Sequence, residues 1–260
     1  MLTDAWRLAV GTLTTVPVAA PAVVDRRRAG AAMLLAPLAV VPLGAAVATV
    51  AMAGHVLGLS ALVTAVLCVA CLALGTRVLH LDGLADVTDG LTASYDKERS
   101  LAVMKSGSSG PAGVVAVVVV LALQVSALAS IFGLLIWWRA AILAGVAVCA
   151  SRGVLVICCA RRVQPARQDG LGSAFTQSVA PGAAMALWVL ITALLAAVGG
   201  WAGADGRLGL AAAVAAVLVT VVVVRHATGR FGGVTGDVFG ACIELALASI
   251  LIVLSSGVFA

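Results

Sequence analysis

Long apolar runs separated by short polar segments are the feature that most constrains this chain. Seven runs are each close to the roughly 20 residues that a helix needs to cross a bilayer. They cover residues 29–54, 57–75, 111–135, 140–160, 181–201, 208–224 and 238–258. These runs are too long and too continuous for the alternating strands of a membrane β-barrel. The sequence therefore predicts an all-α, polytopic integral membrane bundle with about six or seven transmembrane helices.

The composition excludes the main alternatives. Hydrophobic residues make up 63% of the chain and charged residues only 10%, whereas soluble domains average about 25% charged residues. This balance excludes an ordinary soluble enzyme, a disordered chain and a coiled coil. We expect residues 1–260 to form a single membrane-embedded domain, with residues 76–110 as a polar segment between the second and third spans. Pro37 and Pro42 predict a kink or break in the first span.

The distribution of positive charge sets the expected orientation. With the N-terminus inside, 13 of the 16 Lys and Arg residues fall on the cytoplasmic side, and only Arg139 and Arg207 fall in outer loops. The cytoplasmic group comprises Arg7, Arg26, Arg27, Arg28, Arg77, Lys97, Arg99, Lys105, Arg161, Arg162, Arg167, Arg225 and Arg230. This asymmetry accounts for the net charge of +5, so we expect a lipid bilayer and no nucleic acid as partner.

The most informative polar stretch runs from residue 76 to residue 91 and contains three aspartates. Asp82, Asp86 and Asp89 are spaced by four and then three residues, so they share one face of a helix. Carboxylates placed together repel one another, and Mg²⁺, which commonly bridges carboxylates to substrate phosphates, removes that repulsion. A metal site is favoured over a solvated polar face because leucines flank the motif.

A second polar motif lies near the C-terminus, between residues 228 and 244. Its glycines, at positions 229, 232, 233 and 236, predict a flexible loop that opens onto a helix. Backbone N–H groups in such a loop can bind phosphate, and the candidates are Gly232, Gly233, Thr235 and Gly236. Asp237 is expected to complete the metal site or to cap the helix. Glu244, two turns into an apolar run, is expected to contact substrate or to form an interhelical hydrogen bond.

Three further residues are candidates for substrate contacts, each with a structural alternative. Lys105 begins a small-residue loop that either touches phosphate or only connects two helices. Arg152 lies inside an apolar run, so it is expected to face a polar interior and to pair with Glu244 or with substrate phosphate. His80 flanks the acidic motif, where a lone histidine is more often a structural hydrogen-bonding group than a base or ligand. Positive-inside anchoring explains at least two of the three arginines between residues 161 and 167.

The two acidic motifs together resemble those of the cobalamin synthase family, also called adenosylcobinamide-GDP ribazoletransferases. The central family motif, close to H-L-D-G-L-A-D-x-x-D-G, is matched from His80 to Gly90. The C-terminal family motif, G-G-x-T-G-D-x-x-G-A-x-x-E, is matched from Gly232 to Glu244. Further matches at residues 14–18, 151–152 and 166–172 keep the family order, so the resemblance covers most of the chain.

One segment departs from the family pattern. After the central motif the family often reads M-[KR]-D-x-R-x-G, whereas this chain has Ser106 and Ser108 at the Asp and Arg positions. The chain therefore lacks the Asp and Arg side chains through which these two positions could bind substrate. The three-aspartate motif is intact.

The resemblance implies the final step of cobalamin biosynthesis, in the cytoplasmic (inner) membrane. Adenosylcobinamide-GDP and α-ribazole would give adenosylcobalamin and GMP with Mg²⁺, and α-ribazole 5′-phosphate would give the 5′-phosphate product. In this hypothesis Asp82, Asp86 and Asp89 are catalytic, and they hold one or two Mg²⁺ ions together with Asp237. Asp89 is expected to accept the proton of the attacking hydroxyl. A homo-oligomer, or association with other cobalamin-assembly enzymes, remains open.

Two other functions fit the sequence less well. A CDP-alcohol phosphotransferase carries D-G-x-x-A-R, but no arginine follows Ala85 and the later aspartate spacing differs. An ion-coupled transporter would suit intramembrane Glu244 and Arg152. The transporter is disfavoured because the carboxylates gather towards one side of the membrane and no internal repeat is visible.

Overall fold

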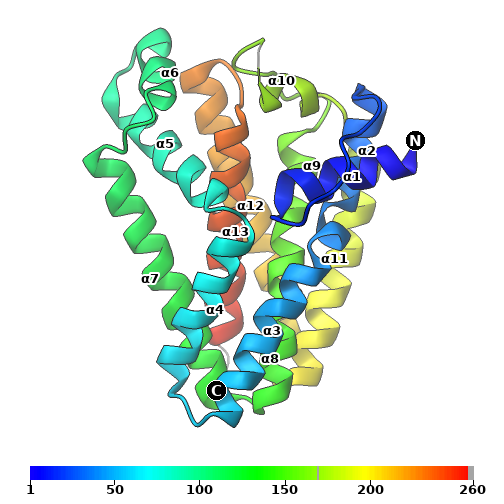
Figure 1. Ribbon diagram of the computed structural model, residues 1–260, viewed down its shortest axis with the longest axis vertical. Helices are drawn as coiled ribbons and strands as arrows, with labels where there is room; N and C mark the ends of the chain where they lie inside the picture. Colours follow the sequence, from blue (N-terminus) through cyan, green and yellow to red (C-terminus); the bar gives the residue numbers. More distant parts are fainter. Residues whose placement is uncertain (169, 257–260) are drawn as a thin grey trace.

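The computed structural model describes residues 1–168 and 170–256, and its regular secondary structure is helical (Figure 1). Six helical segments are long and apolar enough to cross a membrane: Arg26–Val56, Pro111–Leu134, Trp137–Cys158, Pro181–Ala202, Gly206–Phe231 and Gly236–Ser256. A seventh span results if Ala61–Gly75 is counted together with Leu79–Ala93, to which it is bent by 87°. The predicted all-α membrane bundle with six or seven spans is confirmed.

The spans follow the predicted apolar runs, with two informative differences. The first span consists of α2 (Arg26–Ala39) and α3 (Val41–Val56), which break at Val40 between the two prolines, as predicted. Helix α12 (Gly206–Phe231) extends well beyond the predicted end at residue 224. Its last turns carry Arg225, His226 and Arg230, which end the apolar run without ending the helix.

The remaining long helices surround a central one. Helix α13 (Gly236–Ser256) is buried along most of its length. Packed against it are α5 (Leu79–Ala93), α7 (Pro111–Leu134), α8 (Trp137–Ser151) and α12. The short 3₁₀ turn η1 (Arg152–Val154) and α9 (Leu155–Cys158) continue the α8 span, and α11 (Pro181–Ala202) packs against α12. The C-terminal acidic motif therefore lies at the start of the most buried helix.

Several helices outside the six spans gather at the end of the bundle that lies opposite the described end of α13. They are α1 (Leu2–Leu13), α5, α6 (Lys97–Lys105) and α10 (Leu171–Phe175), as Figure 1 shows. The start of α13 lies at this same end. The central acidic motif on α5 and the C-terminal motif on α13 therefore share one end of the molecule.

A strained turn between α4 (Ala61–Gly75) and α5 produces the 87° bend. Arg77 and Val78 have φ angles of 55° and 61°, a region that β-branched residues rarely adopt. The Thr76 hydroxyl donates to the Leu72 and Ala73 carbonyls, and the Val78 N–H donates to the Ala73 carbonyl at 2.8 Å. These bonds hold α5 away from the spanning direction.

Candidate active site

Helices α5 and α13 approach closely at two glycines, and this contact brings the two acidic motifs together. A Cβ atom at Gly83 would lie 2.7 Å from the Asp237 carbonyl oxygen. A Cβ atom at Gly240 would lie 3.0 Å from the His80 Cα. Both neighbours are backbone atoms, which cannot move aside as a flexible side chain can. The two helices reach this spacing because both positions lack a side chain.

The contact gathers three carboxylates with one arginine beside them. Asp82 is exposed and Asp86 is half-buried on α5, and Asp237 is half-buried in the first turn of α13. Burial, together with the charges of Asp82 and Asp237, raises the pKa of Asp86 to about 6, while Arg167 acts in the opposite direction. The Thr235 hydroxyl donates to Asp237 Oδ2 at 3.0 Å. The group carries an excess of negative charge that a cation would relieve.

Two cavities meet at Asp237. The first, of about 170 Å³, is lined by Arg167, Gly170, Gly172, Val234, Thr235, Gly236 and Asp237. The second, of about 120 Å³, shares Gly236 and Asp237 with the first and adds Asp82 and His80 among mostly apolar walls. We call them the polar cavity and the apolar cavity. Asp237 lies on the wall common to both.

A short backbone pairing brings Arg167 to this site. Val234 forms an isolated parallel bridge with Pro165: its N–H donates to the Gln164 carbonyl, and its carbonyl accepts from the Ala166 N–H, both at 2.9 Å. Arg167 follows at once, and its Nη2 donates to the Leu101 carbonyl at 2.5 Å. Arg167 was absent from the predicted site residues. Its position inside the 166–172 family match was the signal that could have found it.

The comparison with known proteins identifies the family. The profile of the cobalamin-5-phosphate synthase family matches residues 5–255. The chain belongs to this family. An adenosylcobinamide-GDP ribazoletransferase of a Nocardioides species is 50% identical over 96% of this chain and 97% of the relative. Enzymes of the same name from Frankia casuarinae and Pseudomonas aeruginosa strain UCBPP-PA14 are 36% and 35% identical, over 96% and 95% of this chain and 93% and 96% of the relatives.

No solved structure matches the chain. Its membership of the cobalamin-5-phosphate synthase family confirms the resemblance inferred from the two acidic motifs, and with it the prediction of a cobalamin-biosynthesis transferase. The matched range contains both motifs, the α5–α13 contact and Arg167.

The glycines of the C-terminal motif have different structural roles. Gly232 ends α12 with a φ angle of 75°, and Gly233 is buried against the backbone of residues 164–166. Gly236 lines both cavities. Gly229 lies inside α12, so the prediction of one flexible loop containing all four glycines is wrong at that position. The helix continues through Gly229 because the preceding polar residues do not interrupt it.

Alanine substitutions separate these roles. Gly229→Ala is expected to leave turnover unchanged and to stabilise the protein by about 0.5–1 kcal/mol, because this exposed helical position has open space around it. Gly233→Ala is expected to destabilise the protein by about 1–3 kcal/mol, because its Cβ would lie 2.4 Å from the Gln164 carbonyl oxygen. Thermal unfolding of both variants in detergent measures the difference. Equal effects would contradict these assignments.

Asp89 differs from the other two aspartates of its motif in its hydrogen-bond partners. Its side chain is buried, and its carboxylate accepts the Gly110 N–H at 2.6 Å and the Gly113 N–H at 2.8 Å. Both glycines lie at the start of α7, so Asp89 caps that helix. Two N–H groups at the end of the small-residue loop that begins at Lys105 are thus bound by a carboxylate of the protein itself.

The capping role of Asp89 predicts a stability effect. Asp89→Ala leaves two N–H groups without an acceptor and is expected to cost about 2 kcal/mol, while Asp89→Asn, which keeps one acceptor oxygen, is expected to cost less. Thermal unfolding measures both variants, and their Mg²⁺ dependence of turnover is compared with that of the wild type. An unchanged melting temperature with turnover abolished would instead support the metal or general-base role predicted from the sequence.

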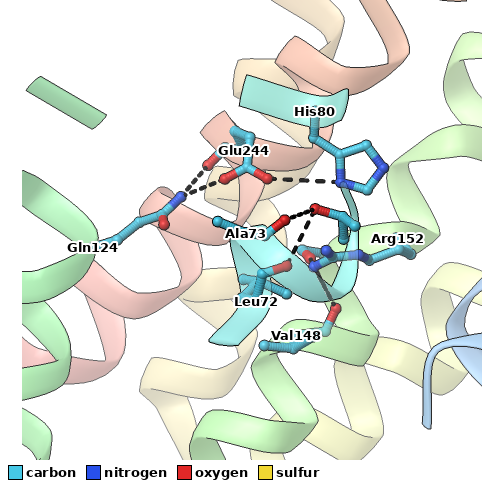
Figure 2. Close-up of polar contacts among 9 residues, drawn as sticks. Leu72, Ala73, His80, Gln124, Val148, Arg152 and Glu244 are labelled. Atoms are coloured by element: carbon cyan, nitrogen blue, oxygen red, sulfur yellow. Dashed lines mark hydrogen bonds and ion pairs between the residues drawn. The ribbon is translucent and has the colours of Figure 1, made fainter. Parts of the chain in front are cut away.

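Figure 2 shows a second polar group, which is made of the buried side chains of His80, Gln124, Arg152 and Glu244. Gln124 Nε2 donates to Glu244 Oε2 at 2.8 Å, and His80 Nδ1 lies 3.7 Å from Glu244 Oε1. Arg152 is fully buried, and its Nη1 donates to the Val148 carbonyl at 3.0 Å. The interhelical hydrogen bond considered for Glu244 is present. Arg152 and Glu244 line neither cavity, whereas His80 lines the apolar one.

The segment that departs from the family pattern lies at the surface. Lys105 is exposed at the end of α6, and the hydroxyl oxygens of Ser106 and Ser108 lie 3.0 Å apart. Ser106 and Ser108 line a surface hollow of about 620 Å³ together with Asp89. Lys105 lines neither of the cavities that meet at Asp237.

The acidic residues do not form a metal site by themselves. Within residues 1–168 and 170–256, no three His, Cys, Asp or Glu side chains converge closely enough to hold a metal ion. The arrangement can offer one or two carboxylates from α5 and α13, and further ligands would have to come from water or substrate.

Proposed function

We propose that this chain transfers the adenosylcobinamide phosphate group from adenosylcobinamide-GDP to a ribose hydroxyl of α-ribazole, and that it also accepts α-ribazole 5′-phosphate. The oxygen of the hydroxyl forms a bond to the cobinamide-linked phosphorus, the bond from that phosphorus to the bridging oxygen breaks, and GMP leaves. The hydroxyl proton is released. The products are adenosylcobalamin, or its 5′-phosphate, and GMP.

One observation carries the proposal. The Gly83–Asp237 contact brings Asp82 and Asp86 of one family motif beside Asp237 of the other, and Arg167 lines the polar cavity together with Asp237. Phosphoryl transfer needs positioning and charge stabilisation more than covalent participation by the protein. Carboxylates next to an arginine and a polar cavity supply both.

The donor set fits Mg²⁺ that is shared with the substrate. Mg²⁺ usually takes one or two carboxylates and completes its octahedron with waters and substrate phosphates. One or two of Asp82, Asp86 and Asp237 would hold it, and burial together with the charges of Asp82 and Asp237 raises the pKa of Asp86. When bound, Mg²⁺ supplies neutralisation of the charge on the pyrophosphate and the leaving GMP.

The residues of the chain have separate tasks in this proposal. Arg167 binds the pyrophosphate in the polar cavity as a fixed, always charged donor. Thr235 orients Asp237 through its hydroxyl hydrogen bond. Asp237, on the wall between the two cavities, is placed to hold the attacking hydroxyl by accepting its hydrogen bond. Gly83 and Gly240 keep α5 and α13 close enough for these groups to act together.

The charge distribution supports an orientation in the cytoplasmic membrane. The 13 Lys and Arg residues assigned to the cytoplasmic side include those of α6, of the α9–α10 connection and of the end of α12, which lie at the end that holds the acidic residues. We place the N-terminus, residues 76–110 and the site on the cytoplasmic face of a single membrane-embedded domain.

A two-donor turnover assay tests the proposed function. The purified protein in lipid nanodiscs is supplied with α-ribazole and Mg²⁺, and with either adenosylcobinamide-GDP or a CDP-alcohol plus its acceptor. We expect equal amounts of GMP and adenosylcobalamin from the first donor, abolished by EDTA and restored by excess Mg²⁺. Product from the CDP-alcohol only, or EDTA-resistant turnover, would refute the proposal.

A further inference from the structure

The apolar cavity is built differently from the polar one beside it. It is lined by residues from six helices, among them the large and buried side chains of Leu13, Met33, Leu155, Phe175, Phe239 and Ile243. Its volume is about 120 Å³. Small-molecule sites commonly combine such apolar and aromatic walls with a few polar groups at fixed positions.

The few polar groups of this cavity lie where a nucleoside would need them. His80 is 6% exposed, and its Nδ1 has no hydrogen-bond partner. Figure 2 shows the opposite edge of the ring turned away from Glu244. Asp82 and Asp237 line the same cavity, and Asp237 also faces the polar cavity. A ligand with an apolar ring system in this cavity would therefore present its polar end at Asp237.

We propose that the apolar cavity binds the aromatic base of α-ribazole and selects it by the size of its apolar ring system. The inference rests on the proposed function and assigns one of its two substrates, α-ribazole, to the apolar cavity. The dimethylbenzimidazole ring lies among Phe175, Phe239 and Met33, and the ribose extends towards Asp82 and Asp237. The attacking hydroxyl then lies at Asp237, where the two cavities meet, next to the pyrophosphate held by Arg167.

The other parts of the two substrates fit this cavity less well. A corrin ring is far larger than 120 Å³. Guanine carries several donors and acceptors, and burying them among apolar walls without partners is unfavourable. Dimethylbenzimidazole has two methyl groups and one ring nitrogen free for hydrogen bonding. Its balance of apolar and polar atoms matches walls that are mostly apolar, with His80, Thr12 and the two carboxylates as the polar residues.

Two substitutions in the walls test the placement. Leu79→Trp enlarges a residue that lines the cavity and is 48% exposed, so the fold tolerates it. Leu74→Trp is the matched control, because Leu74 is 72% exposed near the end of α4 and lines neither cavity. Phe239→Ala widens the cavity instead. Each variant is assayed for KM with both substrates and for binding of labelled α-ribazole by equilibrium dialysis without donor.

The expected results differ between the two substrates. Leu79→Trp raises the KM and the dissociation constant for α-ribazole by about tenfold or more and leaves the KM for adenosylcobinamide-GDP within about twofold. Leu74→Trp changes neither constant. The wild type prefers α-ribazole to the riboside of unmethylated benzimidazole by about tenfold or more in kcat/KM, and Phe239→Ala removes most of that preference.

The outcomes separate this inference from the function on which it rests. If the wild type and Leu74→Trp turn over normally while Leu79→Trp and Phe239→Ala leave α-ribazole binding and base preference unchanged, the base binds elsewhere and only the placement is wrong. Parallel changes in KM for both substrates would also overturn it. If the wild type forms no product from adenosylcobinamide-GDP, the proposed function fails and the placement falls with it.

Discussion

Replacing Asp82 or Asp86 with alanine is expected to lower kcat/KM by about 1,000-fold or more. In our account these carboxylates belong to the group that holds Mg²⁺ together with the substrate pyrophosphate. Losing one directed electrostatic contact to a transition state costs about 100- to 1,000-fold in other enzymes, and loss of the metal would remove several contacts at once. The measurement is initial-rate kinetics in nanodiscs with both substrates and a series of Mg²⁺ concentrations.

Stability and a matched acidic residue provide the controls for this prediction. At pH 7, above the pKa of about 6, Asp86 is ionised and repels its neighbours, so Asp86→Ala should not lower the melting temperature of the metal-free protein. Glu98→Ala removes an exposed carboxylate from α6 and is expected to retain normal turnover. Near-normal activity of both Asp82→Ala and Asp86→Ala would exclude the metal site.

Gly83→Val is expected to lower turnover by about 100-fold or more without touching any charged group. The Cβ atom alone would lie 2.7 Å from the Asp237 carbonyl oxygen and 2.9 Å from the Asp237 Cα. Because both atoms belong to the backbone, α5 and α13 must separate, and Asp82 and Asp86 must move away from Asp237. A misplacement of about 1 Å in a reacting assembly costs about 100-fold.

Two other glycines distinguish misplacement from a general effect of added bulk. Gly182→Ala, in α11, meets no atom within 4 Å and is expected to leave turnover unchanged. Gly240→Ala, whose Cβ would lie 3.0 Å from the His80 backbone, should have a smaller effect than Gly83→Val. Size-exclusion chromatography and circular dichroism check that each variant is folded. Full activity of folded Gly83→Val would show that the close contact is not needed.

The features that could be predicted from the sequence are those that the bilayer requires. Hydropathy predicts the spans because each must bury about 20 residues in hydrocarbon, and the break at Val40 follows from the two prolines. The two acidic motifs were predicted to form one site because both fall at the same side of the membrane. The contact between Gly83 and Asp237 supports that hypothesis, although the distance itself had no signal in the sequence.

Contacts between a side chain and a segment far away in the sequence could not be predicted. The spacing of Asp89 places it with Asp82 and Asp86, yet its carboxylate caps α7 through the N–H groups of Gly110 and Gly113. Helical periodicity gives the face of a residue and says nothing about which helix end meets that face. Arg167 was missed for a similar reason, because a single bridge between residues 165 and 234 brings it to the site.

The most direct test of the shared metal site is the metal preference of Asp237→Cys. Thiolates bind soft Cd²⁺ well and Mg²⁺ poorly. If Asp237 is a ligand, the variant should lose turnover with Mg²⁺ and recover a measurable part of it with Cd²⁺. Glu98→Cys, treated identically, should stay active with Mg²⁺ and gain nothing from Cd²⁺. Wild-type turnover of Asp237→Cys with Mg²⁺ would contradict our account, because the carboxylate on α13 would then have no part in holding the metal.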